Sequence, residues 1–568
     1  AVNMATTLLV TGNVDFNGDL DVDGTTNLDV VDIDGAVDMA STLTLAGNAD
    51  FNGNLDVDGT TDLDGLTVAG NLSVDGGTIK LDGNYPTGTN NVALGDIALA
   101  DGSLSGGNNT AIGRSSLYSN TSGANNTGIG SGALENNTTA ASNTAVGYHS
   151  LLANTTGADN VAVGATSLDA NTTGAENVAV GKSSLTGNTT GDFNTAVGEN
   201  ALANNTTADN NTAIGRRAML ANTTGTGGVA VGTSALAANT TGDYNIAIGL
   251  NALDENTTGT QNTALGLSCL GSNTTGGFNN ALGVGALANN TTAGNNTAVG
   301  HSALNANTTG GLNTAVGAFA LESNTTGEFN VAMGYEALEE NTTADSNSAF
   351  GYRALTANTT GASNTAVGSL SLDANTTGSS NTAVGENALG ANTTGSNNAA
   401  FGEGSLLKNT TASDNVSVGD ASMVENTTGA SNVAVGRLAL NANTTASFNT
   451  AIGSEAGDAL TTGNQNVAVG ANALTSETQG DRNVAIGISA LEAQNNTSDV
   501  DSYNTAVGAR AGAAITTGVQ NTLVGGLAGD AITTANDNAA FGTLALSANT
   551  TGASNTGIGK SALLSNTT

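Results

Sequence analysis

Acidic residues near the N-terminus have the spacing with which calcium-binding loops begin. Asp19, Asp21 and Asp23 alternate with apolar residues and precede Gly24. Carboxylates in this pattern supply oxygen ligands to Ca²⁺ in EF-hand loops, but the bidentate glutamate at the twelfth position of such a loop is Val30 here. Strict alternation is also typical of a strand with one solvated face. A solvated acidic face is therefore the first interpretation, and a calcium site is the alternative.

A second acidic run has the same form. Asp56 and Asp58 precede Gly59, and the twelfth position counted from Asn54 is Gly65. This run therefore also lacks the bidentate ligand of an EF-hand loop. Calcium is the only cofactor that the sequence suggests.

The tripeptide Asn-Thr-Thr recurs through most of the chain and matches the acceptor pattern for N-glycosylation. Turns favour the same residues, because Asn tolerates left-handed backbone and Thr bonds locally, so both interpretations stay open. Glycosylation further requires secretion by a cell that has the machinery. The candidate acceptors are Asn154, Asn171, Asn188, Asn205, Asn222 and Asn239.

Residue types that carry catalysis are scarce. The chain has two histidines, His149 and His301, and one cysteine, Cys269, and no Ser/His/Asp or Cys/His set can be assembled around them. A polysaccharide-degrading enzyme would need two carboxylates held at a fixed separation, and the acids recur at no fixed pair of positions. We therefore predict that the chain is not an enzyme, with a polysaccharide-degrading enzyme as a remote alternative.

The composition restricts the partners. Eleven Lys and Arg residues against 48 Asp and Glu give a net charge of −37. Nucleic-acid binding is excluded because so few cations cannot displace the counterions of phosphates, and an anionic membrane surface would repel the chain. The sequence contains no apolar run of about 18 residues, so we do not expect a membrane-embedded protein.

An internal repeat determines the architecture. Asn143, Asn160 and Asn177 each begin a similar pentad and lie 17 residues apart, and 28 such starts occur between Asn91 and Asn555. The averaged unit is N-T-A-V-G-x-x-A-L-x-x-N-T-T-G-x-x. A unit this short cannot bury a core alone, so stacked units must share one. We predict an all-β, elongated parallel β-solenoid or β-roll with one 17-residue coil per repeat over residues 91–568.

Each position of the unit has a predicted role. Positions 2 to 4 alternate as a short strand with one apolar face, and the bulky position 4 and the leucine of position 9 are the expected core anchors. Positions 6 and 7 accept charged residues such as Arg216 and Arg217 and should face solvent. Asn and Thr should stack in columns along the array, as in cross-β ladders.

Paired substitutions at positions 9 and 12 of the repeat test this coil arrangement. Where position 9 is glycine, position 12 is aliphatic instead of Asn. This pattern indicates that the two positions share one core pocket, because an aliphatic group at position 12 would fill the space that position 9 leaves. The three pairs are Gly457 with Leu460, Gly512 with Ile515, and Gly529 with Ile532.

Residues 1–90 lack the 17-residue unit. Glycines recur every six residues at Gly12, Gly18 and Gly24, and apolar residues alternate with acids between them. This pattern predicts strands with one buried face and bends at the glycines. We predict an N-terminal hexad-repeat β-helical shaft over residues 1–90.

The pentads also resemble known repeats. Asn-Thr-Ala-Val-Gly at 143–147 and Asn-Val-Ala-Ile-Gly at 483–487 are similar to the Asn-Ser-Val-Ala-Ile-Gly head repeat of YadA-like trimeric autotransporter adhesins. The acidic segment 20–24 followed by such arrays also resembles the repeat shafts of bacteriophage tail fibres. Both resemblances imply an extracellular trimeric fibre, and the first implies a parallel β-roll with one repeat per coil.

The expected function is that of an extracellular structural and adhesive fibre on a cell surface or virion, either a surface filament or an adhesin shaft. A bacteriophage tail fibre shaft is the alternative, and an ice-binding protein is a remote one. The expected partners are other copies of the chain, as a homotrimer or a head-to-tail filament, and a cell-surface glycan or receptor. Aromatic residues at position 17 either cover a seam between coils or subunits or stack on sugars; they are Phe193, Tyr244, Phe278, Phe329 and Phe448.

Overall fold

The computed structural model describes residues 11–12, 89–101 and 103–567. The chain divides into two units, residues 1–79 and 80–568, and every strand of the described residues lies in the second. The predicted N-terminal shaft lies outside the described residues, as do the calcium candidates Asp19, Asp21, Asp23, Asp56 and Asp58.

The described part of the chain is all-β and contains no α-helix. Nearly every strand has three residues and occupies positions 2 to 4 of one repeat. The strands are β1 Val92–Leu94, β2 Thr110–Ile112, β3 Thr127–Ile129, β4 Thr144–Val146, β5 Val161–Val163, β6 Val178–Val180, β7 Thr195–Val197, β8 Thr212–Ile214, β9 Val229–Val231, β10 Ile246–Ile248, β11 Thr263–Leu265, β12 Asn280–Leu282, β13 Thr297–Val299, β14 Thr314–Val316, β15 Val331–Met333, β16 Ser348–Phe350, β17 Thr365–Val367, β18 Thr382–Val384, β19 Ala399–Phe401, β20 Val416–Val418, β21 Val433–Val435, β22 Thr450–Ile452, β23 Val467–Val469, β24 Gly480–Asp481, β25 Val484–Ile486, β26 Val500–Asp501, β27 Thr505–Val507, β28 Thr522–Val524, β29 Ala539–Phe541 and β30 Thr556–Ile558.

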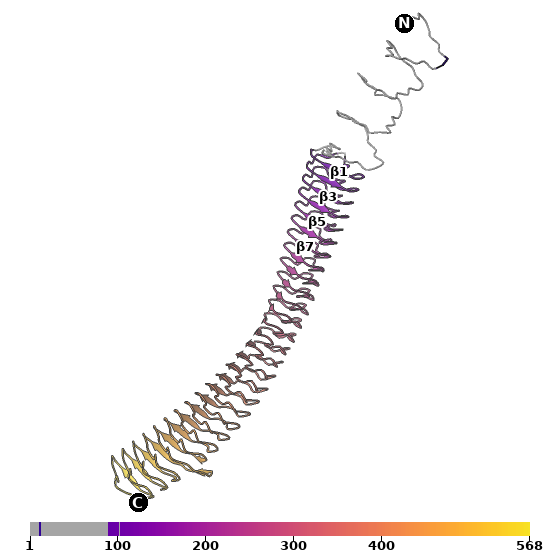
Figure 1. Ribbon diagram of the computed structural model, residues 1–568. Helices are drawn as coiled ribbons and strands as arrows, with labels where there is room; N and C mark the ends of the chain where they lie inside the picture. The colour runs from indigo at the N-terminus through magenta and orange to yellow at the C-terminus, as the bar shows by residue number, and fades with distance from the viewer. Residues whose placement is uncertain (1–10, 13–88, 102, 568) are drawn as a thin grey trace. The chain divides into compact units, whose positions relative to one another are not determined.

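Twenty-eight of these strands form one parallel sheet. Each strand pairs in register with the strand of the next coil, so that β4 pairs with β5 and β5 with β6. Figure 1 shows these coils following one another between β1 and β30. The predicted parallel β-solenoid of 17-residue coils is therefore confirmed. The short strands β24 and β26 form a separate pair beside the large sheet.

Tight corners close each coil. In one coil the backbone has positive φ at His149, Leu151 and Asp159, with values of 54°, 51° and 59°. A left-handed residue reverses the chain locally and costs about 1–2 kcal/mol when it is not glycine, so neighbouring coils must hold these corners in place. The corner at Leu151 also directs position 9 into the interior, where the side chain is fully buried.

The glycine at position 5 is required by close contact between coils. Gly147 has a φ of 136°, and a Cβ added there would lie 2.5 Å from the carbonyl oxygen of Gly164 in the next coil. A side chain would therefore both strain the backbone and separate the coils. This close approach explains why position 5 is glycine in every repeat.

The interior is a narrow column of small and medium-sized side chains. In one coil it consists of Ala145 at position 3, Ser150 at position 8 and Leu151 at position 9, all fully buried. The same positions of the next coils extend the column into one continuous core. Coils therefore bury the apolar surface of their neighbours and not only their own.

Two asparagine ladders line the rest of the interior. The Asn143 side chain accepts from the backbone N–H of Asn160 at 2.9 Å, and its Nδ2 donates to the Gly157 carbonyl at 2.9 Å. The Nδ2 of Asn154 donates to the same carbonyl and to Oδ1 of Asn137, both at 2.9 Å. Buried amides are stable only when their hydrogen bonds are made, so the predicted Asn columns are confirmed and hold coil to coil.

Position 4 is not the core anchor that the sequence predicted. The inward residue of each strand in the large sheet is position 3, which is alanine in most coils, whereas positions 2 and 4 point outward. Met333 at position 4, for example, keeps 42% of its surface exposed. The alternation was identified correctly, but the buried face was assigned to the bulkier residues. The physical reason is the thin coil, which leaves room for a methyl group opposite Leu at position 9.

The shared pocket of positions 9 and 12 is confirmed. A Cβ added to Gly457 would lie 3.0 Å from Cδ1 of Leu460, and one added to Gly529 would lie 2.7 Å from Cδ1 of Ile532. The aliphatic group at position 12 therefore occupies the space that a leucine at position 9 fills in other coils. Glycine also suits this corner, because its φ is positive there.

Candidate functional site

The most extensive candidate site is a surface rather than a pocket. The first and third residues of each strand in the large sheet correspond to positions 2 and 4 of the repeat, and they point away from the core. We call these outward side chains the outer face. Because the strands pair in register, the outer face consists of two parallel columns that run from β1 to β30.

Apolar side chains dominate the outer face. The third residue of every strand is Val, Ile, Leu, Met or Phe, and the first is most often Thr or Val. Many of these side chains stay exposed, including Leu265, Phe401 and Ile452, each with slightly more than 40% of its surface accessible. Single exposed apolar residues are common on proteins, whereas a continuous apolar patch marks an interaction surface.

Charge is absent from the outer face. None of the 28 strands of the large sheet has Asp, Glu, Lys or Arg at its first or third residue. Charged residues occur instead at other outward positions; Arg216 and Arg217 at positions 6 and 7 are exposed, as predicted. The outer face is therefore an uncharged strip on a strongly acidic molecule.

The aromatic residues of position 17 border the outer face. Position 17 lies two residues before position 2, at one of the left-handed corners of the coil, with a buried Asn between them. Phe448 and Tyr244 have 63% and 60% of their surface exposed. The Tyr244 ring lies against Gly227 of the preceding coil, where an added Cβ would be 2.7 Å from its Cδ1. A seam between coils, a seam between subunits and a sugar surface all stay open for these rings.

A second row of rings lies on successive coils beyond position 4. His301 and Phe319 have ring centroids 5.2 Å apart, Phe319 and Tyr335 5.8 Å, and Tyr335 and Tyr352 5.8 Å. These residues occupy positions 6 and 7 of four consecutive coils. They widen the apolar surface next to β13 to β16.

The glycosylation candidates lie inside the array. Each is fully buried, and the Asn154 amide donates both its hydrogen bonds internally, to Asn137 and to Gly157. An attached sugar would have to replace these bonds and separate the coils. The geometry therefore argues against glycans on the folded chain at Asn154, Asn171, Asn188, Asn205, Asn222 and Asn239.

One coil carries an acid where most coils have the position 12 asparagine. Glu477 occupies position 12 and is fully buried. Its Oε1 accepts from the backbone N–H groups of Gly480 at 2.8 Å and Asn496 at 3.0 Å, and its Oε2 accepts from Nε2 of Gln494 at 2.8 Å. A buried carboxylate requires such partners. The structure thus buries an acid at a position that is Asn in most coils.

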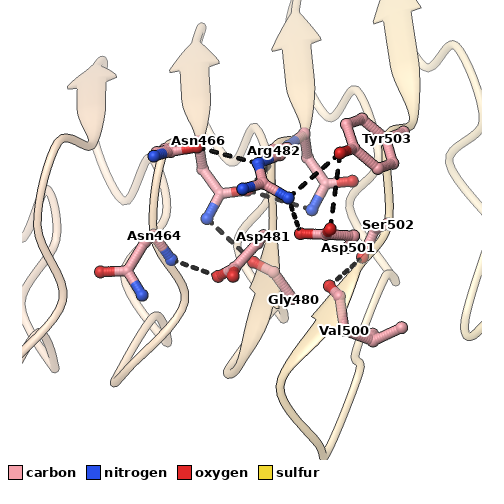
Figure 2. Close-up of polar contacts among 11 residues, drawn as sticks. Asn464, Asn466, Gly480, Asp481, Arg482, Val500, Asp501, Ser502 and Tyr503 are labelled. Atoms are coloured by element: carbon pink, nitrogen blue, oxygen red, sulfur yellow. Dashed lines mark hydrogen bonds and ion pairs between the residues drawn. The ribbon is translucent and has the colours of Figure 1, made fainter.

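The next coil is four residues longer than the repeat, because the starts Asn483 and Asn504 lie 21 residues apart. It contains strand β26, which pairs in parallel with β24. Figure 2 shows Arg482 forming an ion pair with Asp501 and donating to the hydroxyl of Tyr503 at 3.1 Å. These contacts tie the longer coil to its neighbour.

Asp481 lies at the edge of this network. Its Oδ1 accepts from the backbone N–H of Asn464 at 2.5 Å (Figure 2). Burial raises the pKa of the Asp481 carboxyl, the bond from Asn464 opposes the rise, and the nearby carboxylates of Asp499 and Asp501 add to it. The described residues contain no group of three His, Cys, Asp or Glu arranged to hold a metal ion.

The remaining reactive side chains are separate from one another. His149 stacks on Tyr148 with ring centroids 3.7 Å apart, and His301 belongs to the aromatic row of another coil. Cys269 is fully buried, and burial raises the pKa of its thiol to about 12. The three residues His149, His301 and Cys269 lie in three different coils.

No protein-family model and no curated protein matches the chain. In the part of the chain that the structure describes, none of the elements is a helix with the length and apolarity needed to traverse a lipid bilayer.

Sequence reasoning missed the outer face. The signal was present, because the absence of charge at positions 2 and 4 can be read from the sequence. The uncharged apolar pattern at position 4 predicts a buried core, because core positions are also apolar and uncharged.

Proposed function

We propose that this chain is an extracellular structural and adhesive fibre, a surface filament or adhesin shaft of stacked β-coils that acts by mechanical extension and not by catalysis. One observation carries the proposal: the 28 strands of the large sheet repeat one coil with the same register. Enzymes concentrate chemistry in one pocket, whereas this repetition distributes every feature evenly along the array.

The contacts between coils suit a load-bearing role. Backbone bonds such as Thr155 N to Thr172 O at 2.9 Å are accompanied by the hydroxyl of the same threonine donating to the same carbonyl at 2.9 Å. Since each coil adds similar intrinsic and neighbour terms, stability grows with the number of coils. At about 4.8 Å per coil, 28 coils extend roughly 130 Å.

The charge supports an exposed location. A net charge of −37 disfavours indiscriminate bundling through mutual repulsion. The adhesive part of the proposal rests on the exposed rings at position 17, because aromatic faces suit contact with sugars or other apolar partners.

Imaging of the purified chain, together with immunogold labelling of the organism that produces it, tests the proposal. We expect unbranched rods of roughly 130 Å or their multiples, with label at the cell surface. Label on virions would assign the chain to a tail fibre shaft instead. Compact particles, or label restricted to the cell interior, would refute the fibre.

A further inference from the structure

We infer that the outer face is the surface through which two copies of this chain associate side by side. The inference rests on the proposed function, in that it names the partner of the fibre. It starts from the exposed apolar columns at positions 2 and 4, which no element of the described residues covers.

The residue at position 2 of the outer face changes where position 4 is Phe. The third residue of a strand is Phe in only three strands of the large sheet, β16, β19 and β29. In the same three strands, and in no other of the large sheet, the first residue is Ser or Ala instead of Thr, Val, Ile or Asn. Phe at position 4 is therefore always paired with a small side chain at position 2.

Water imposes no such limit on volume. A surface that only faces solvent can carry a Phe next to a Val, because nothing lies above them to be displaced. Packed surfaces do impose a limit, since extra volume forces neighbours out of place. The chain shows the same exchange in its core between Gly457 and Leu460, where the packing is visible. The exchange at positions 2 and 4 therefore indicates that the outer face is packed too.

The dimensions and charge of the face match another copy of the chain. A strip three residues wide and 28 strands long has an area of roughly 1,300 Å², while a specific interface needs about 800 Å² on each partner. Two molecules of charge −37 repel each other, and contact through an uncharged strip keeps their carboxylates apart. A second array with the same spacing can cover the face along its whole length.

The first test removes the apolar character of the face. Lysine replaces the outward third strand residues in Val299→Lys, Val316→Lys, Val367→Lys and Val384→Lys. The control carries the same added charge at position 11 of the same coils, in Ala306→Lys, Ser323→Lys, Ala374→Lys and Ala391→Lys. Analytical ultracentrifugation and circular dichroism report mass and fold.

We expect the wild type and the control to sediment as multiples of the 55.0 kDa chain, and the outer-face variant to dissociate at a concentration at least tenfold higher than the control does. A wild type that stays monomeric at every soluble concentration overturns the inference, as does equal assembly of the two variants. A monomeric rod seen in the microscope would leave the fibre itself intact.

A second pair of variants keeps the fold unperturbed. Ala399→Val adds volume beside Phe401 on the outer face, and the double variant Ala399→Val/Phe401→Val restores a combination that other coils carry, as in β5 and β6. The single variant should weaken association, and the double variant should recover it, with both melting as the wild type does. Equal association of both variants would show that volume on this face does not matter.

Discussion

At the scale of single residues, the fold depends on a few positions where the backbone conformation and the neighbouring atoms allow only one residue type. Gly317 at position 5 has a φ of 137°, and a Cβ there would lie 2.3 Å from the carbonyl oxygen of Gly334. Gly404 at position 7 has a φ of 62°, but nothing lies within 4 Å of an added Cβ. Position 7 is left-handed with ordinary side chains in other coils, so this glycine is not required.

These two glycines give a matched pair. We expect Gly317→Ala to destabilise the array by about 3 kcal/mol or more, because strain and a clash with backbone coincide. Gly404→Ala should change the free energy of unfolding by about 1 kcal/mol or less. Chemical denaturation followed by circular dichroism measures both. Similar losses in the two variants would contradict the close approach described for position 5.

The exchange between positions 9 and 12 makes a second prediction at this scale. Asn307→Leu removes an amide that bonds Asn290 and Gly310, and we expect a loss of about 2 kcal/mol. Adding Leu304→Gly reproduces the combination of the coil that contains Gly457 and Leu460. A double-mutant cycle should show a favourable coupling of about 1 kcal/mol, and additive losses would show that the two positions do not share a pocket.

At the scale of the coil, three-residue strands are too short to be stable alone, and the hydrogen-bonded ladders between coils hold them. Several carboxylates are partly buried between coils for this reason. Burial is the main cause that raises the pKa values of Asp254, Asp373 and Asp458. A side chain at position 10 thus lies close enough to the next coil to lose part of its hydration.

These carboxylates determine how stability depends on pH. A carboxyl whose folded pKa is raised binds protons more tightly in the native state, so stability is lost as pH rises through the folded pKa. We expect the melting temperature to rise as pH falls from 7 toward the ordinary carboxyl range near 4. The variant Asp254→Asn/Asp373→Asn/Asp458→Asn should show a smaller rise.

A charge-matched control separates burial from net charge. Asp159→Asn/Glu176→Gln/Asp537→Asn neutralises three carboxylates that are exposed. This control should keep most of the pH dependence of the wild type. If the two triple variants lose the pH dependence of the melting temperature equally, that dependence is caused by charge repulsion across the whole molecule and not by burial of the three carboxylates.

At the scale of the molecule, the array behaves as a sum of neighbouring coils. Deleting residues 296–312 removes one full coil and joins equivalent positions. We expect this variant to fold, with a melting temperature within a few degrees of the wild type, because only one neighbour term is lost. Circular dichroism and thermal melting report the outcome.

A deletion that breaks the period is the control. Removing residues 296–304 deletes part of one coil and breaks the period. Positions 12 to 17 of that coil are then out of register with the next coil, so buried asparagines lose their hydrogen-bond partners. We expect a large loss of stability or failure to fold. Equal behaviour of the two deletions would show that register between coils is not what holds the array.

The sequence by itself determined the period, the coil and the pocket shared by positions 9 and 12, because a solenoid repeats its side chains as often as its backbone. It did not determine which side of the strand is buried, since Ala at position 3 and Val at position 4 are both apolar. Nor did it determine that Asn154 and Glu477 lie inside, because polar residues are buried only where partners exist.

Only the tertiary structure decided these points. The left-handed corners at positions such as Leu151 set the thickness of the coil. That thickness leaves room for a small side chain at position 3 opposite Leu at position 9, and Leu523 is buried at position 3 where position 9 is Gly529. The bulkier residues are therefore turned outward, and an apolar pattern that indicates a core in the sequence becomes a surface in the folded molecule.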